Sequence, residues 1–103
     1  MALTITPPIH PGEILREEYL APLNLKPYTL AKKLRVPRTR IERLVSELTP
    51  VSPDTALRLA RFFGTTPQFW MNMQAAYDLA TEAEAKKDEI ALIDPLSEPR
   101  LAA

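Results

Sequence analysis

Hydrophobic residues recur at helical spacing on both sides of one short segment in the first half of the chain. Leu30 and Leu34 lie four residues apart, and Ile41 and Leu44 lie three apart. Such spacing places the apolar side chains on one face of an α-helix. The segment 35–37 between the two pairs contains a proline and is too short for anything but a tight turn. Two short helices joined in this way predict a helix-turn-helix.

Three further helices are predicted from start signals that combine a capping side chain with a proline. Proline suits the first position of a helix, and a polar side chain just before it can bond the free backbone N–H groups of the first turn. This combination occurs at His10-Pro11, Ser52-Pro53 and Thr66-Pro67. The sequence therefore predicts one helix before the helix-turn-helix and two after it.

The ends of these helices follow from stop signals and from the apolar spacing. Pro22 is expected to stop the first helix at residue 20 or 21, and Gly64 is expected to end the fourth, over about 53–63. The fifth helix is expected to extend to about residue 87, although its apolar positions thin after Ala80. The fold class is therefore all-α, with five helices and no strand pattern.

The same spacing predicts which side chains of the outer helices face inward. Aromatic residues at helical spacing belong more often to a core than to a ligand site, so Trp70 and Tyr77 are assigned to the core or its edge. The inward positions are Ile14, Leu15, Tyr19, Leu20, Leu23, Leu25, Ala56, Leu57, Ala60, Phe63, Trp70 and Tyr77.

The chain is expected to form a single domain. Its 103 residues match the usual size of one domain. Residues 1–8 carry weak signals and are expected to form a flexible arm, and residues 9–87 hold all the predicted helices. The segment 88–103 contains two prolines and little periodicity, so it is expected to form a loose C-terminal tail.

Charge is balanced over the whole chain but unevenly distributed along it. Residues 26–43 carry seven Lys or Arg and a single acid, Glu42, for a net charge of +6, whereas residues 66–103 carry three basic and seven acidic residues, for −4. A local basic face, rather than the total charge, is typical of a DNA-binding protein. An ordinary solvated helix face is the alternative, and the coincidence with the helix-turn-helix favours DNA binding.

The second helix of the helix-turn-helix is the predicted DNA-reading element. Arg38 and Thr39 occupy its N-terminal end, and Arg43 lies one turn along from Thr39. Arginine suits guanine, and threonine can bond a base or meet a thymine methyl group. Arg40, Lys32 and Lys33 are assigned to backbone phosphates, which add affinity without sequence information. Glu42 is interpreted as an ion-pair partner of a neighbouring arginine rather than as a reader of cytosine.

Several function classes are excluded by what the sequence lacks. Cysteine is absent, and the one histidine stands at a predicted helix cap, so neither a metal site nor another cofactor is expected. Carboxylates spread over helix surfaces without a glycine-rich phosphate loop predict no catalytic site and hence no enzyme. The chain shows no signal peptide and no apolar stretch of about 20 residues, so a cytoplasmic protein without membrane contact is expected.

The order of these segments resembles a known family. IHPGEILREEYLAPL at 9–23, the helix-turn-helix at 28–46, and SPDTALRLARFFGTTPQFWMNMQAAYDL at 52–79 are together similar to the HigA/VapI antitoxins. These belong to the phage-repressor-like helix-turn-helix regulators, so the resemblance implies a five-helix lambda-repressor-like DNA-binding domain. The similarity covers roughly residues 9–80, and the pairing of HPGE with FFGTTPQFW is its most specific part.

The resemblance implies an antitoxin of a bacterial type II toxin–antitoxin system. Such a protein neutralises a HigB/RelE-like mRNA endonuclease toxin and, as a homodimer, represses its own operon by binding the operator DNA. Carried over by position, the residues that read DNA are Arg38, Thr39 and Arg43. The residues near the DNA backbone are then Arg40 and members of the preceding helix, namely Thr29, Lys32 and Lys33.

Two departures from the family pattern bear on DNA binding. The turn usually carries glycine where this chain has Arg35, which must adopt a left-handed conformation or relax the turn. The loop after the reading helix often reads Asn-Gly-Lys-Arg, whereas this chain has Ser-Glu-Leu-Thr at 46–49. Loss of two loop cations and gain of an acid predict weaker or differently tuned binding to DNA.

Two other functions remain open from the sequence. The chain can be a toxin-neutralising interaction module with little DNA binding, or a helix-turn-helix regulator without a toxin partner. Helix-turn-helix domains usually act as twofold dimers. We expect the polar far end of the fifth helix to make the contact between subunits.

Overall fold

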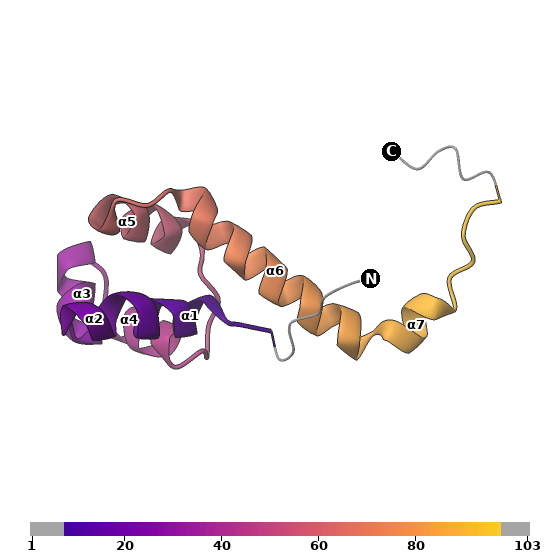
Figure 1. Cartoon of the computed structure of the whole chain (residues 1–103), viewed down its shortest axis with the longest axis horizontal. Helices are drawn as coiled ribbons and strands as arrows, with labels where there is room; N and C mark the ends of the chain where they lie inside the picture. Colours follow the sequence, from indigo (N-terminus) through magenta and orange to yellow (C-terminus); the bar gives the residue numbers. More distant parts are fainter. Residues whose placement is uncertain (1–7, 98–103) are drawn as a thin grey trace.

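The computed structural model describes residues 8–97, which form helices joined by turns and short connecting segments (Figure 1). In chain order the elements are α1 (Pro11–Ile14), the π-helical η1 (Leu15–Leu20), α2 (Ala21–Leu23), α3 (Pro27–Leu34), α4 (Arg38–Val45), α5 (Pro53–Phe63), α6 (Pro67–Ala85) and α7 (Lys87–Ala91). The predicted all-α class is confirmed. Residues 1–7 of the predicted arm and 98–103 of the predicted tail lie outside the described residues.

The first predicted helix is continuous from α1 through η1 to α2, and the expectation that Pro22 stops it is wrong. In η1 the hydrogen bonds reach one residue further back, so that the Ala21 N–H bonds the carbonyl of Arg16. The wider π turn leaves room for the proline ring, which clashes with the carbonyl four residues back in a regular α-helix. The helix ends instead at Asn24, in the left-handed conformation with φ 52°.

The capping prolines begin helices as the sequence predicts. His10 accepts a hydrogen bond of 2.8 Å from the Gly12 N–H, and Ser52 and Thr66 accept bonds from the N–H groups three residues ahead. A proline stands in the first turn of each of these helices. Gly64 ends α5 with φ 75°, which confirms its assignment as a helix stop.

Side chains from five of the helical elements, η1, α3, α4, α5 and α6, meet in one core. Trp70, Leu15, Leu30, Ile41 and Leu59 are among its fully buried members, so the N-terminal helix, the helix-turn-helix, α5 and α6 share it. Two predicted core positions are wrong. Leu57 is 59% exposed, because Leu59 rather than Leu57 completes the buried stripe of α5, and Leu23 is 60% exposed at the end of α2.

Gly12 sets the distance between the N-terminal helix and α4. A Cβ atom at this position would lie 1.9 Å from the carbonyl oxygen of Leu44, so no side chain fits there. The absence of a side chain lets α1 lie directly against the C-terminal turn of α4. The glycine of the HPGE segment is thus required for packing.

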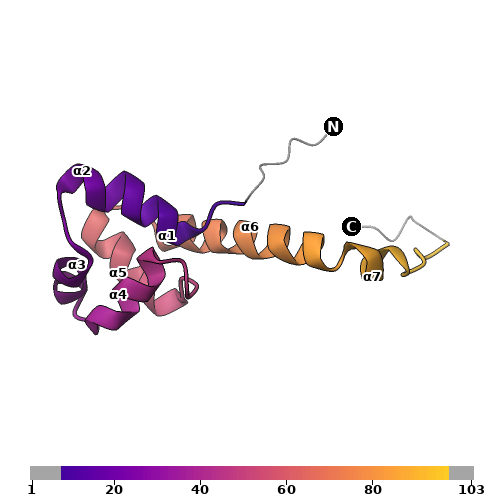
Figure 2. The ribbon, with the colours of Figure 1, turned by 90° about the horizontal axis from the view of Figure 1, so that it is seen from below.

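The helix α6 extends away from the rest of the domain and carries α7 at its far end, as two perpendicular views show (Figures 1 and 2). Only Trp70 and Gln74 of α6 are buried, and every residue from 82 to 97 is exposed. The structure ends α6 at Ala85 and adds the short α7 in a segment where the sequence predicted no separate element. Among the described residues no helix is both long and apolar enough to cross a membrane.

Candidate nucleic-acid interface

The predicted helix-turn-helix is present as α3, a turn at 35–37, and α4. Arg35 ends α3 in the left-handed conformation, with φ 64°, as the sequence analysis allowed. Its N–H bonds the Lys32 carbonyl at 3.1 Å, and the N–H of Val36 bonds the Ala31 carbonyl at 3.0 Å. This is the pattern with which a glycine usually closes a helix, here formed by arginine at a cost of about 1 kcal/mol.

The helix α4 presents a basic and hydroxyl-bearing face to solvent. Ile41, Leu44 and Val45 point into the core. Because an α-helix turns by about 100° per residue, Thr39 and Arg43 lie on the side opposite to that stripe. Arg38 is exposed at the N-terminal end of the same helix. The three residues predicted to read DNA are thus all accessible in the described chain.

Arg38 is held by its neighbours while it stays open to solvent. Its guanidinium lies 2.9 Å from Oε2 of Glu42 and 5.7 Å from the ring centre of Tyr28 on α3, and its side chain is 68% exposed. The interpretation of Glu42 as an ion-pair partner is confirmed. Two contacts on different helices restrict the rotamers of Arg38, which lowers the entropy lost when it binds a ligand.

A shallow hollow adjoins the outer face of α4. It has a volume of about 200 Å³ and is lined by Thr39, Glu42, Arg43, Ser46 and Leu48. Leu48 is 73% exposed, so an apolar side chain stands beside the candidate reading face. Glu47 before it has φ 64°, which turns the chain sharply after α4.

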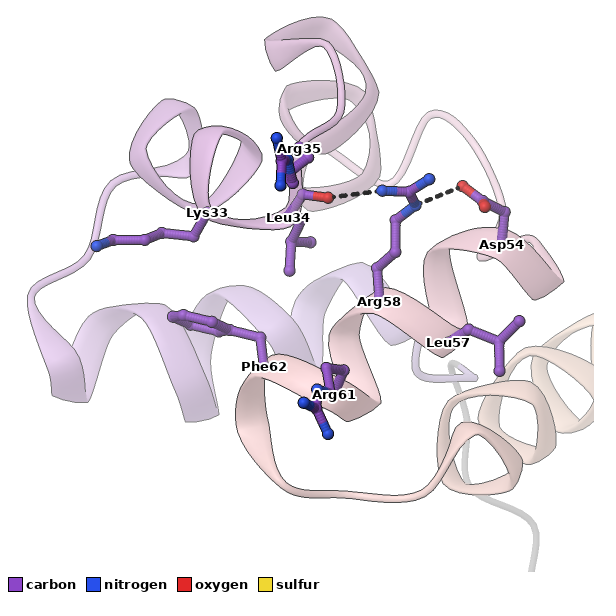
Figure 3. Close-up of a pocket in the computed structure, with 8 residues that line it drawn as sticks. All are labelled: Lys33, Leu34, Arg35, Asp54, Leu57, Arg58, Arg61 and Phe62. Atoms are coloured by element: carbon purple, nitrogen blue, oxygen red, sulfur yellow. Dashed lines mark hydrogen bonds and ion pairs between the residues drawn. The ribbon is translucent and has the colours of Figure 1, made fainter.

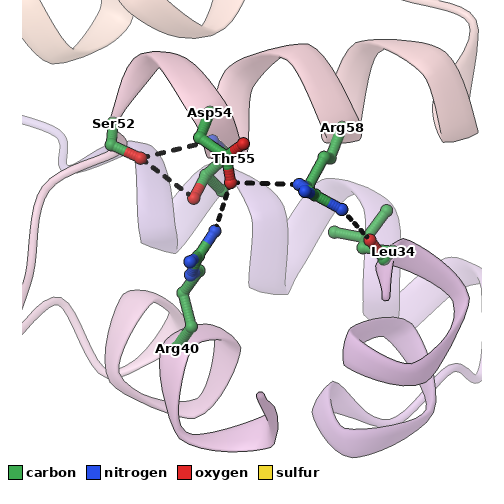
Figure 4. Close-up of polar contacts among 6 residues, drawn as sticks. All are labelled: Leu34, Arg40, Ser52, Asp54, Thr55 and Arg58. Atoms are coloured by element: carbon green, nitrogen blue, oxygen red, sulfur yellow. Dashed lines mark hydrogen bonds and ion pairs between the residues drawn. The ribbon is translucent and has the colours of Figure 1, made fainter. Parts of the chain in front are cut away.

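The residues assigned to phosphates do not all lie beside the three exposed residues of α4, Arg38, Thr39 and Arg43. Thr29 is half-buried in the first turn of α3, and Lys32 is exposed in its last turn. Arg40 extends from α4 toward α5 and pairs with Asp54 (Figure 4). Lys33 lines a groove between α3 and α5 (Figure 3). Arg40 and Lys33 therefore lie apart from the hollow beside Thr39 and Arg43.

Asp54, in the first turn of α5, bonds Arg40 of α4 and also Arg58 of its own helix. Its Oδ2 accepts hydrogen bonds from Arg40 and, at 3.0 Å, from Nε of Arg58. Hydrogen bonds from Arg40, and next from Arg58, hold the pKa of Asp54 below its usual value. The contact with Arg40 fixes the start of α5 against α4.

Two arginines outside the helix-turn-helix bond the C-terminal ends of its helices. Arg58 donates from Nη1 to the Leu34 carbonyl at 2.8 Å, and Arg16 donates from Nη1 to the carbonyl of Val45. Leu34 and Val45 are the last residues of α3 and α4. A cation at this end also complements the helix dipole. Neither arginine was predicted from the sequence to have such a role.

His10 lies beneath the loop that follows α4. It is buried, its Nδ1 accepts from Gly12, and its ring packs edge-on against Tyr77 of α6 with ring centres 4.8 Å apart. Burial lowers the pKa of His10 from 6.5, and the nearby carboxylates of Glu47 and Asp78 oppose that shift. These contacts fit a structural cap that joins α1 to α6.

Comparison with known proteins decides the family. A helix-turn-helix family profile matches residues 15–70. The virulence-associated protein I of Dichelobacter nodosus is 55% identical over 91 residues, which are 88% of this chain and 83% of that protein. The chain belongs to the helix-turn-helix family. The antitoxin HigA-1 of Vibrio cholerae is 33% identical over 89 residues, which cover 86% of this helix-turn-helix protein and 84% of the antitoxin.

Solved structures show the same relationship for this helix-turn-helix protein. A structure described as the Pseudomonas aeruginosa antitoxin HigA with higBA promoter superposes with a TM-score of 0.84 at 46% identity, over 86% of this chain and 98% of that one. The resemblance to HigA/VapI antitoxins is therefore confirmed. Relatives of this kind are regulators and antitoxins rather than enzymes, in agreement with the sequence analysis.

Proposed function

We propose that the protein is the antitoxin of a type II toxin–antitoxin system and acts as a homodimeric, cytoplasmic repressor of its own operon. In this role it binds operator DNA through α4 and neutralises a HigB/RelE-like mRNA endonuclease toxin. The observation that carries the DNA-binding part is the exposure of Arg38, Thr39 and Arg43 on a helix-turn-helix that superposes on an antitoxin solved with its promoter.

The chemistry of α4 suits the major groove of DNA. We assign Arg38 and Arg43 to guanine, whose O6 and N7 atoms match a guanidinium fork, and Thr39 to a base edge or a thymine methyl group. Thr29 and Lys32, on the neighbouring helix, are assigned to phosphates. Arg40 and Lys33 are the weaker members of the predicted set, because Arg40 pairs with Asp54 and Lys33 lies on the α3–α5 groove.

A twofold dimer is part of the proposal because one domain of this size contacts only a few base pairs. The far part of α6 has the surface for it, since Leu79 is 72% exposed and the following residues have few neighbours. Dimerisation through α6 would leave both copies of α4 available to two half-sites of a palindromic operator. No cofactor is required for this activity.

Operator binding tests the reading face directly. Wild-type protein and the variants Arg38→Ala, Arg43→Ala and Lys87→Ala are titrated onto the DNA upstream of the gene in a gel-shift assay. The loss of one good base contact is expected to weaken operator binding by about tenfold, with little change on unrelated DNA. Lys87 is an exposed cation on α7 and serves as the control. Equal operator affinity for all four proteins would contradict the assignment of α4.

Toxin neutralisation is tested separately by co-expression with the product of the adjacent gene. The proposal expects the two proteins to co-purify and expects growth to be restored when both are present. The variant Arg38→Ala should still restore growth, since its defect is confined to DNA. Operator binding without any toxin partner would instead identify a plain transcription regulator.

A toxin-neutralising module with little DNA binding is the second candidate. It is favoured by one observation, the loop after α4, in which Glu47 and Leu48 are exposed and no residue from 46 to 49 is a cation. An acid and an apolar side chain in this loop make no favourable contact with phosphate. Growth rescue together with unmeasurable operator binding by the wild-type protein would select this candidate.

A further inference from the structure

A groove between α3 and α5 combines an apolar surface with a basic border. It has a volume of about 570 Å³, and its apolar lining includes Leu57 and Phe62, which are 59% and 41% exposed (Figure 3). Leu57 and Phe62 extend from α5 toward opposite ends of this lining (Figure 3), and an exposed apolar lining bordered by polar residues is typical of a surface that binds another molecule. We call this surface the α3–α5 groove.

The cations on the border of the α3–α5 groove are available to a ligand. Arg58 is already engaged by Asp54 and by the Leu34 carbonyl. Lys33, Arg35 and Arg61 are exposed and form no ion pair within the described residues 8–97. A fitting partner therefore carries several acids together with apolar side chains.

The C-terminal segment, defined here as residues 88–97, has this composition. Its apolar residues Ile90, Leu92 and Ile93 are 57%, 82% and 66% exposed. Its acids are Asp88, Glu89 and Asp94, and none of them forms an ion pair with another residue that the structure describes. Charge and hydrophobicity of the segment are thus complementary to those of the α3–α5 groove.

The segment cannot reach the groove of its own copy while α6 is intact. The 19 residues of α6 form a rod of about 28 Å, and the segment begins beyond its far end. Figures 1 and 2 show α6 leading away from α3 and α5. In a pair of molecules whose α6 helices run antiparallel, however, the far end of one helix lies near the domain of the other.

We propose that the C-terminal segment of a second copy docks in the α3–α5 groove, so that two molecules exchange their tails. Ile90, Leu92 and Ile93 cover Leu57 and Phe62, while Asp88, Glu89 and Asp94 face Lys33, Arg35 and Arg61. The inference rests on the proposed homodimer and identifies the α3–α5 groove as a contact surface between its two copies. The exchange buries the apolar side chains of both surfaces and leaves the outer face of α4 open.

Site-specific cross-linking tests the contact on the full-length chain, which contains no cysteine of its own. Phe62→Cys protein is mixed with Ile93→Cys protein and treated with a short bis-maleimide. The proposal expects a covalent dimer from this mixture. It expects far less product when Leu23→Cys, an exposed position on α2, replaces Phe62→Cys. Equal yields from the two mixtures, or no product from either, would overturn it.

A charge exchange gives an independent measurement by analytical ultracentrifugation. Arg61→Glu and Asp94→Lys should each weaken self-association by about tenfold, because each homodimer places like charges opposite each other. An equimolar mixture should recover the wild-type affinity, since in the heterodimer both tails again meet a groove of opposite charge. A mixture that does not recover the wild-type self-association affinity would refute the pairing of Asp94 with Arg61, whatever the effect of each single variant.

Other occupants of the groove give distinct results. If Arg61→Glu weakens operator binding but not self-association, the groove holds DNA phosphates and the proposal is wrong. If it weakens only co-purification with the toxin, the groove serves the toxin and the proposal is equally wrong. Wild-type binding to the operator is measured in parallel. A dimer that binds DNA but shows no tail contact therefore refutes this inference alone.

Discussion

Arg58 on α5 donates a hydrogen bond of 2.8 Å from Nη1 to the main-chain carbonyl of Leu34, the last residue of α3. Its Nε bonds Asp54 at 3.0 Å, and Asp54 in turn accepts from Arg40 on α4. One arginine thus connects both helices of the helix-turn-helix to α5. The position of α4 relative to α3 and α5 depends on a residue that itself belongs to neither helix of the helix-turn-helix.

Replacement of Arg58 by alanine is expected to lower the free energy of unfolding by about 1–2 kcal/mol, because the Leu34 carbonyl and Asp54 both lose a donor. Operator affinity should fall as well, since α4 is less firmly positioned. Urea denaturation and a gel-shift titration measure the two effects. Lys87→Ala, an exposed change on α7, should stay within about 0.5 kcal/mol of wild type. A similarly small effect of Arg58→Ala would show that the bond contributes little.

The substitution Gly12→Ala is expected to destabilise the protein by more than about 3 kcal/mol. The new methyl group would lie 1.9 Å from the Leu44 carbonyl oxygen, so α1 and α4 must separate. Gly64→Ala is the matched comparison, because a Cβ there meets nothing within 4 Å. Its expected loss of about 1–2 kcal/mol in the free energy of unfolding comes only from the left-handed backbone, with φ 75°. Thermal unfolding of both variants measures the difference. Equal losses would argue against the close approach of the helices.

Stability is expected to fall when the solution is acidified below the ordinary pKa of histidine. Burial lowers the pKa of His10 from 6.5, so the unfolded chain binds a proton at a pH where the folded chain does not. The contribution of His10 is therefore complete above about pH 6.5 and is lost as the pH falls through the lower folded value. Urea denaturation at a series of pH values measures this dependence.

The variant His10→Asn is the control for that measurement, because asparagine also caps helices but does not titrate in this range. It should flatten the curve in the region just below pH 6.5. The pKa of Asp54 is lowered as well, from 3.8, so its contribution is lost at more acidic pH and does not overlap. An unchanged curve in His10→Asn would assign the dependence to another group.

The variant Leu48→Lys is expected to bind the operator more tightly. Leu48 is 73% exposed and lines the hollow beside Thr39 and Arg43. A cation there is placed to contact phosphate, which should also steepen the salt dependence by about one released counterion. Gel shifts at several salt concentrations measure both quantities, with Leu48→Gln as an uncharged control. An operator affinity of Leu48→Lys no higher than that of wild type would contradict the proposal that this loop weakens DNA binding.

Local signals account for what the sequence predicted well. The starts of α5 and α6 depend on Ser52-Pro53 and Thr66-Pro67, and a cap acts within three residues of its partner. The buried stripe across the helix-turn-helix follows from spacing alone. The position of Arg35 was noticed because the family pattern usually carries glycine there, and of the two outcomes left open, a left-handed residue or a relaxed turn, the structure has the left-handed one.

Contacts between distant segments account for what was missed. Arg16 and Val45 are 29 residues apart, and Arg58 and Leu34 are 24 apart. A short sequence pattern therefore cannot predict that these arginines bond the ends of other helices. The exposure of Leu57 depends likewise on which elements lie over α5. Pro22 was misjudged for a local reason, since the π turn that accommodates it has no clear sequence signature.

Because α6 extends beyond the core, the stability of its backbone hydrogen bonds is expected to differ along its length. A helix that lacks a neighbour along its outer half is only marginally stable in water. Its amide protons beyond Tyr77 should therefore exchange with deuterium rapidly in dilute protein, while those near Trp70 stay protected. As the protein concentration rises and molecules associate, protection should extend to the amides beyond Tyr77. The exchange rate of these amides then reports the degree of self-association.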